Sequence, residues 1–104
     1  MARYRMTPRE LGARLQELRF IRHLSLREVA EKIELPPTTL SGWERGMRFP
    51  PTERLQQLAE LYDVPLGNLY GTSDEWRDWF TRAWAKLEEA SLQVNRLFSR
   101  LVVL

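Results

Sequence analysis

The sequence predicts an all-α protein in which short helices are followed by one long C-terminal helix. Capping residues stand before apolar segments whose spacing of three and four residues is typical of one helix face. Prolines and glycines interrupt the chain as far as Gly71, but neither residue type occurs after it. We therefore expect two domains: residues 1–71, which open with a flexible basic arm of residues 1–6, and residues 72–104.

The first helix is predicted to begin directly after Thr7. Thr7 and Glu10 have the spacing of a capping box, in which each side chain accepts a hydrogen bond from the backbone N–H of the other residue. Pro8 suits the first helical position because its missing N–H is not needed there. The apolar face of this helix comprises Leu11, Leu15, Leu18 and Ile21.

Two short helices joined by a tight turn are predicted next. Ser25 and Glu28 form a second capping box, so the earlier helix begins at Ser25. The prolines at positions 36 and 37 force the preceding backbone out of the helical region, which predicts a stop near Glu34. The apolar residues of this helix are Val29, Ala30 and Ile33.

The later of these helices, residues 37–45, has one apolar side and one bare polar side. Pro37 suits its first turn, and Gly46 is placed to end it in a left-handed cap. At about 100° per residue, Leu40 and Trp43 lie opposite a polar stripe. The stripe consists of Thr38, Ser41, Gly42 and Arg45. A stripe of such small bulk lets the helix backbone approach a large surface such as a DNA major groove, although an ordinary surface helix is the alternative.

At these residues the chain resembles the Cro, lambda-repressor and xenobiotic-response-element (XRE) family of helix-turn-helix DNA-binding domains. The resemblance covers roughly residues 11–70 and includes Ala30 between the two helices, the run Trp43-Glu44-Arg45-Gly46 and Pro50. Matching hydrophobic positions are Val29, Ile33, Leu35, Leu40, Leu55, Leu58, Ala59, Leu61, Val64 and Leu69. The resemblance implies a five-helix, lambda-repressor-like domain whose third helix enters the major groove, usually as part of a homodimer.

The same resemblance places the base-reading positions on Pro37, Thr38 and Gly42, with Arg45 at the end of the helix. None of these is Gln or Asn, the residues that make paired hydrogen bonds to adenine, so we expect phosphate contacts and DNA shape to carry much of the affinity. The predicted DNA-binding residues are Arg3, Arg5, Arg27, Pro37, Thr38, Thr39, Ser41, Gly42, Arg45 and Arg48.

The distribution of charge favours a polyanionic partner. The whole chain carries a net charge of +2, whereas residues 1–27 contain seven arginines and two glutamates, 7 − 2 = +5. Arg3 and Arg5 are expected either to act as an arm that follows the DNA backbone or enters the minor groove, or to form a solvated tail. Arg19 is assigned a different role, because the resemblance pairs it with Glu44 on the far side of the recognition helix as a structural ion pair.

The last helix is predicted to begin near Thr72 and to carry an apolar seam. The seam residues are spaced four and three apart: Trp76, Phe80, Ala83, Leu87, Ala90, Val94, Leu97, Leu101 and Leu104. Such a seam is too apolar to face water, and burial in a homodimer or a tetramer is preferred over packing on the chain's own domain or on a different protein. A continuous helix and a hairpin broken near Ser91 or Asn95 both remain open.

Composition excludes several classes of function. The chain has no cysteine and one histidine, His23, which has no partner set for catalysis, so we expect no enzyme activity, metal or cofactor. No signal peptide and no apolar run of eighteen residues is present, which predicts a cytoplasmic, nucleoid-associated bacterial or phage protein without membrane contact. The predicted function is a transcriptional regulator, and a repressor in particular, that binds double-stranded DNA as a homodimer. The alternatives are a protein-interaction module on a helix-turn-helix scaffold and an antitoxin.

Overall fold

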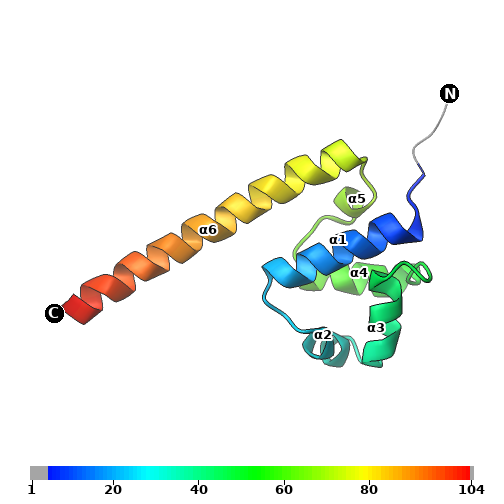
Figure 1. Cartoon of the computed structure of the whole chain (residues 1–104), viewed down its shortest axis with the longest axis horizontal. Coiled ribbons are helices and arrows are strands. Elements are labelled where there is room, and N and C mark those ends of the chain that lie inside the picture. Colours follow the sequence, from blue (N-terminus) through cyan, green and yellow to red (C-terminus); the bar gives the residue numbers. More distant parts are fainter. Residues whose placement is uncertain (1–4, 104) are drawn as a thin grey trace. The chain divides into compact units, whose positions relative to one another are not determined.

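A computed structural model describes the backbone of residues 5–103 and the side chains of residues 5–90. The described residues form helices and no strands, so the predicted all-α fold is confirmed. The helices are α1 (Pro8–Ile21), α2 (Leu26–Lys32), α3 (Pro37–Glu44), α4 (Thr52–Leu61), α5 (Leu66–Leu69) and α6 (Ser73–Val103) (Figure 1). The chain divides into two compact units, Met1–Thr72 and Ser73–Leu104.

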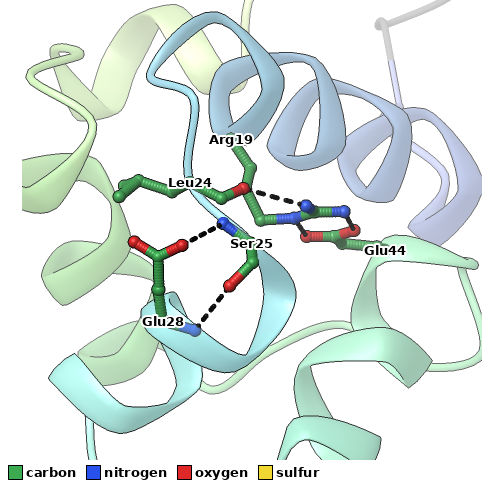
Figure 2. A network of polar contacts seen from close by, with 5 residues as sticks. All are labelled: Arg19, Leu24, Ser25, Glu28 and Glu44. Carbon is green, nitrogen blue, oxygen red and sulfur yellow. Dashed lines mark hydrogen bonds and ion pairs between the residues drawn. The ribbon is translucent and has the colours of Figure 1, made fainter.

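The predicted capping residues begin the first two helices. The Thr7 hydroxyl accepts a hydrogen bond from the Glu10 backbone N–H at 3.1 Å, and Pro8 occupies the first helical position. At α2 both bonds of the capping box are present: Glu28 N–H donates to the Ser25 hydroxyl at 3.0 Å, and Ser25 N–H donates to the Glu28 carboxylate at 3.2 Å (Figure 2). These bonds satisfy N–H groups that have no partner inside the helix.

The helices α1 to α4 end in the same way, with one residue in the left-handed region. These residues are His23 (φ 55°), Glu34 (φ 56°), Gly46 (φ 77°) and Asp63 (φ 53°). In each case the N–H of the following residue donates to the carbonyl five positions earlier, which closes a Schellman-type cap. The helix α2 ends at Lys32, its C-cap is Ile33 and Glu34 is the left-handed residue, so the chain leaves the helix within two residues of the predicted stop near Glu34.

Only α3 ends in glycine, and its packing explains why. A Cβ atom at Gly46 would lie 2.7 Å from the Cα atom and 2.9 Å from the backbone nitrogen of Arg9. A side chain is therefore excluded there by the neighbouring α1 as well as by the backbone angle. His23, Glu34 and Asp63 are all exposed, and each of them accepts a left-handed conformation that costs a residue with a side chain on the order of 1 kcal/mol.

The core of the first unit is formed by the predicted apolar faces. In α1 the four predicted residues are buried, with Leu15 and Leu18 fully inaccessible. The remaining buried apolar residues of this unit are Val29, Ala30, Ile33, Leu40, Trp43, Leu55, Leu58, Ala59, Tyr62, Val64 and Leu69. Within this core α3 packs against α1 and α2, and α4 packs against α5.

Several arginines hold helix ends together instead of facing solvent. Arg14 donates to the carbonyls of Leu69 at 2.8 Å and Gly71 at 2.6 Å, and it is buried. The Arg22 guanidinium donates twice to the Tyr62 carbonyl, at 3.2 and 2.9 Å. Three of the seven arginines in residues 1–27 therefore bind groups of the protein itself: Arg14, Arg19 and Arg22. Fewer positive charges of this segment are thus available to a polyanion than its net charge suggests.

The second unit consists of α6, a single helix from Ser73 to Val103, so the hairpin alternative is not adopted. Near its start, the Trp76 ring stacks on Trp79 with 5.4 Å between centroids and lies 5.7 Å from Phe80. Of the predicted seam, Trp76 is buried, Phe80, Ala83 and Leu87 are half-buried, and Ala90 is exposed. Val94, Leu97, Leu101 and Leu104 lie outside the residues whose side chains the structure describes. Among the described residues, no helix has the length and apolarity needed to span a membrane.

Candidate nucleic-acid interface

The inner face of α3 packs against α1 and α2. Leu40, Trp43 and Glu44 are buried, as the helical spacing predicts for this side. A Cβ atom at Gly12 of α1 would lie 2.4 Å from the Trp43 carbonyl oxygen and 2.5 Å from that of Glu44. The backbones of α1 and α3 thus touch, which fixes the position of α3.

A buried ion pair reinforces this contact. The Arg19 guanidinium donates two hydrogen bonds to the Glu44 carboxylate, at 2.7 and 2.9 Å, and a third to the Leu24 carbonyl at 3.1 Å (Figure 2). The hydrogen bond that Arg19 donates to the Glu44 carboxylate raises the pKa of Arg19 above its usual value, although burial acts in the opposite direction. Because Leu24 directly precedes the cap of α2, one side chain connects α1, the start of α2 and the end of α3.

The outer face of α3 is less covered than the inner face. Thr38 and Arg45 are exposed, and Thr39, Ser41 and Gly42 are half-buried. A Cβ atom at Gly42 would meet no atom within 4 Å. Packing therefore does not require a glycine at this position, and the backbone angle of Gly42 does not require one either.

A shallow depression of about 300 Å³ lies beside Gly42. Its lining residues come from α3 and the loop that follows: Thr38, Thr39, Gly42, Trp43, Arg45, Met47 and Arg48. Met47 is 68% exposed, so a long apolar side chain borders the depression while remaining accessible to solvent. Two arginines, Arg45 and Arg48, lie on its border and are exposed as well.

Comparison with known proteins supplies the family. Residues 10–69 match the protein family described as "Helix-turn-helix domain". The chain belongs to this family. The resemblance predicted from the motif residues is thus confirmed, and α2, the turn and α3 lie within the matched residues.

Two curated relatives each match about 60% of the chain. The chain is 36% identical over 62 residues to the uncharacterized HTH-type transcriptional regulator YobD of Bacillus subtilis, which covers 60% of this chain and 55% of YobD. It is 32% identical over 63 residues to the cryptic phage CTXphi transcriptional repressor RstR of Vibrio cholerae, covering 61% and 57%. The chain thus spans about half the length of these curated relatives.

A solved structure supports the fold of the helix-turn-helix domain. The DNA-binding domain of BldD from S. venezulae superposes with a TM-score of 0.54 and 35% identity, over 62% of this chain and 96% of that domain. The superposition therefore covers nearly the whole BldD domain. In this chain, the superposed fraction is similar to the fraction that matches the helix-turn-helix family.

The helix-turn-helix domain brings some predicted site residues together and leaves others apart. Thr38, Thr39, Gly42, Arg45 and Arg48 border one depression. Pro37, Arg27 and Arg5 are exposed and do not line it, while Arg3 lies outside the described residues. Among the described residues, no group of three or more His, Asp or Glu side chains is arranged to hold a metal ion.

Among the described residues of this domain, four exposed large apolar residues were not predicted as site residues, and two of them lie in the loop after α3. Met47 and Phe49, 68% and 49% exposed, flank Arg48 in the loop after α3. The sequence contains a signal for them, because large apolar residues between a helix-ending glycine and a proline have no helix face on which to be buried.

Proposed function

We propose that this protein is a DNA-binding transcriptional regulator that places α3 in the major groove of duplex DNA. One observation carries the proposal: α3 is fixed by backbone contact and a buried ion pair on one face, while its other face has open space at Gly42. A helix held rigidly and left without bulk on the outside can bring its backbone close to base edges.

Three exposed arginines of α2, α3 and the following loop are suited to phosphate contacts. Arg27 at the start of α2, Arg45 at the end of α3 and Arg48 in the following loop are exposed. A guanidinium can donate two parallel hydrogen bonds to a phosphate, which makes arginine more specific in orientation than lysine. Arg5, and Arg3 before it, would extend this set along the DNA backbone.

Direct base recognition by α3 rests on few groups. Pro37 has no N–H to donate, while Thr38, Thr39 and Ser41 each offer one hydroxyl. Arg45 is the only residue of the predicted base-reading set that can make a bidentate contact, which on a base would select guanine. We therefore expect moderate specificity in which DNA shape contributes beside direct contacts.

We further propose that two copies assemble through α6 and repress by occlusion. Half-buried Phe80 and Leu87 and the 44% exposed Trp84 leave an apolar strip on the described part of this helix. A two-fold pair would set two α3 helices about 34 Å apart, one turn of DNA, and cover the site. The description of RstR as a repressor supports this direction of regulation.

The proposal is tested by duplex binding at varied salt concentration. A random duplex library selected with the full chain should give a consensus site with two related halves, and affinity should fall linearly in log K against log salt. Arg45→Ala should weaken binding to this site at least tenfold. Arg82→Ala removes the same charge from an exposed residue of α6 and serves as the control. If the protein binds no duplex at low salt, the proposal of a DNA-binding regulator is wrong and the protein-interaction module becomes the preferred function.

A further inference from the structure

We propose that the depression beside Gly42 receives the 5-methyl group of a thymine in the major groove. The inference rests on the proposed function and adds to it the chemical group that is recognised. Two observations support it: an accessible apolar wall at Met47 and open space above Gly42.

The chemistry of the groove singles out this group. Base edges in the major groove present hydrogen-bond donors and acceptors, and the 5-methyl group of thymine is the one apolar substituent among them. Residues with apolar side-chain atoms line the depression, namely Met47, Trp43, Thr38 and Thr39. No side-chain amide lines it that would instead recognise adenine.

The geometry allows a methyl group to reach this wall. Any side chain at residue 42 would project into the space outside α3, and the glycine leaves that space empty. The Met47 side chain is 68% exposed to solvent. Contact with a thymine methyl group would therefore remove apolar surface of Met47 and of the methyl group from water. Burial of one methyl-sized group changes an equilibrium constant by about fourfold.

The flanking arginines serve a separate purpose. Arg45 and Arg48 border the depression, and their charge suits phosphate oxygens or a guanine edge but not a methyl group. Removal of the methyl group should therefore lower affinity and leave the salt dependence of binding unchanged, since the number of neutralised phosphates stays the same.

Thymine-to-deoxyuridine replacement tests the inference, because this change removes only the methyl group and retains every hydrogen-bonding atom. The thymines of the selected duplex are replaced one at a time, and dissociation constants are measured by fluorescence anisotropy with the full chain. We expect one position in each half-site to respond with a loss of about fourfold, and both together with about sixteenfold. The slope of log K against log salt should stay constant.

Variants of the protein locate the contact. Met47→Ala should lose most of the difference between the thymine duplex and the deoxyuridine duplex at the responding position. Thr39→Ser, which removes the methyl group of another lining residue, should reduce the difference by a smaller amount. Phe49→Ala is the matched control, since Phe49 lies in the same loop and is 49% exposed but does not line the depression. This control should keep the full fourfold difference. Thermal unfolding followed by circular dichroism checks that each variant is folded.

Several outcomes would overturn the inference. A selected site in which no thymine responds, or a Met47→Ala protein that retains the fourfold difference, removes the methyl contact while DNA binding itself stands. If Phe49→Ala abolishes the difference and Met47→Ala does not, the methyl group lies against a different part of the loop. If no duplex binds at all, the proposed function fails, and the methyl contact fails with it.

Discussion

The inner and the outer face of α3 belong to the same eight-residue helix, yet neighbouring atoms restrict only one of them. On the inner side, a single added carbon at Gly12 would overlap two backbone carbonyls. On the outer side, an added carbon at Gly42 would touch nothing. The residues of the inner face are thus required for folding, whereas those of the outer face can be chosen for a ligand. Substitutions on each face should separate stability from binding.

Loss of the buried ion pair should give the largest effect. Glu44→Ala leaves the Arg19 guanidinium without its carboxylate in a buried position, and we expect the free energy of unfolding to fall by about 3–5 kcal/mol. Urea denaturation followed by circular dichroism measures this change. The double variant Arg19→Met with Glu44→Leu is the control, because it removes both charges and should recover much of the loss. A loss below 1 kcal/mol in Glu44→Ala, on the order of a surface pair, would mean that the pair does not hold α3.

Gly12→Ala should be the next most damaging change. The new Cβ atom would lie 2.4 and 2.5 Å from the carbonyl oxygens of Trp43 and Glu44, so α1 and α3 must separate. Overpacking against backbone atoms is expected to cost about 3 kcal/mol or more. The shift of the urea midpoint gives the value. An unchanged midpoint would show that the two helices are not in direct backbone contact.

The same substitution at Gly42 should act in the opposite direction on stability. Alanine fits the open space and favours the helix, so Gly42→Ala should raise the free energy of unfolding by up to about 1 kcal/mol. Its methyl group would hold the α3 backbone away from a groove floor, and we expect affinity for the selected duplex to fall about tenfold, which corresponds to about 1.4 kcal/mol. Equal affinity in a more stable protein would show that α3 does not approach DNA closely at this residue.

Local signals in the sequence predict the helices and both faces of α3, but contacts between distant residues are not visible in them. The capping box at Ser25 and the pair Pro37 and Gly46 act within a few residues, so their positions are readable directly. Gly12 carries no such signal, because its role depends on α3, some thirty residues away along the chain. Arg14 is a second example. Its charge alone suggests a surface position, but its guanidinium donates hydrogen bonds to carbonyls 55 and 57 residues further along the chain.

The ends of α1, α2 and α4 show a related limit. A glycine is the usual sign of a left-handed helix end, and it correctly predicts the end of α3 at Gly46. His23, Glu34 and Asp63 adopt the same conformation without this sign, because the caps at these ends hold the backbone there despite the side chain. The outer-face residues were predicted as a set, but the depression depends on how the loop with Met47 folds beside α3.

The smallest expected effect concerns Tyr62, which is fully buried near the inner face. No hydrogen-bond partner for its hydroxyl is found among the described residues, so Tyr62→Phe should change the free energy of unfolding at pH 7 by less than about 1 kcal/mol. Burial raises the pKa of Tyr62 above its ordinary value, and the charge of Glu44 acts in the same direction. The folded protein therefore keeps this proton at a pH where the unfolded chain loses it.

The sign of the pH dependence follows from that difference. A raised pKa in the folded state gives a stabilisation that is complete below the unfolded value, near pH 10, and is lost as the pH rises above it, by about 1.4 kcal/mol per pH unit. Tyr62→Phe lacks this group, so its free energy of unfolding should fall less steeply than that of the parent between about pH 10 and pH 11. Urea titrations of both proteins at pH 7, 9, 10 and 11 measure the two slopes. Parallel slopes would place the hydroxyl in contact with water, whereas a loss of 2 kcal/mol in the variant at pH 7 would reveal a hydrogen-bond partner for it.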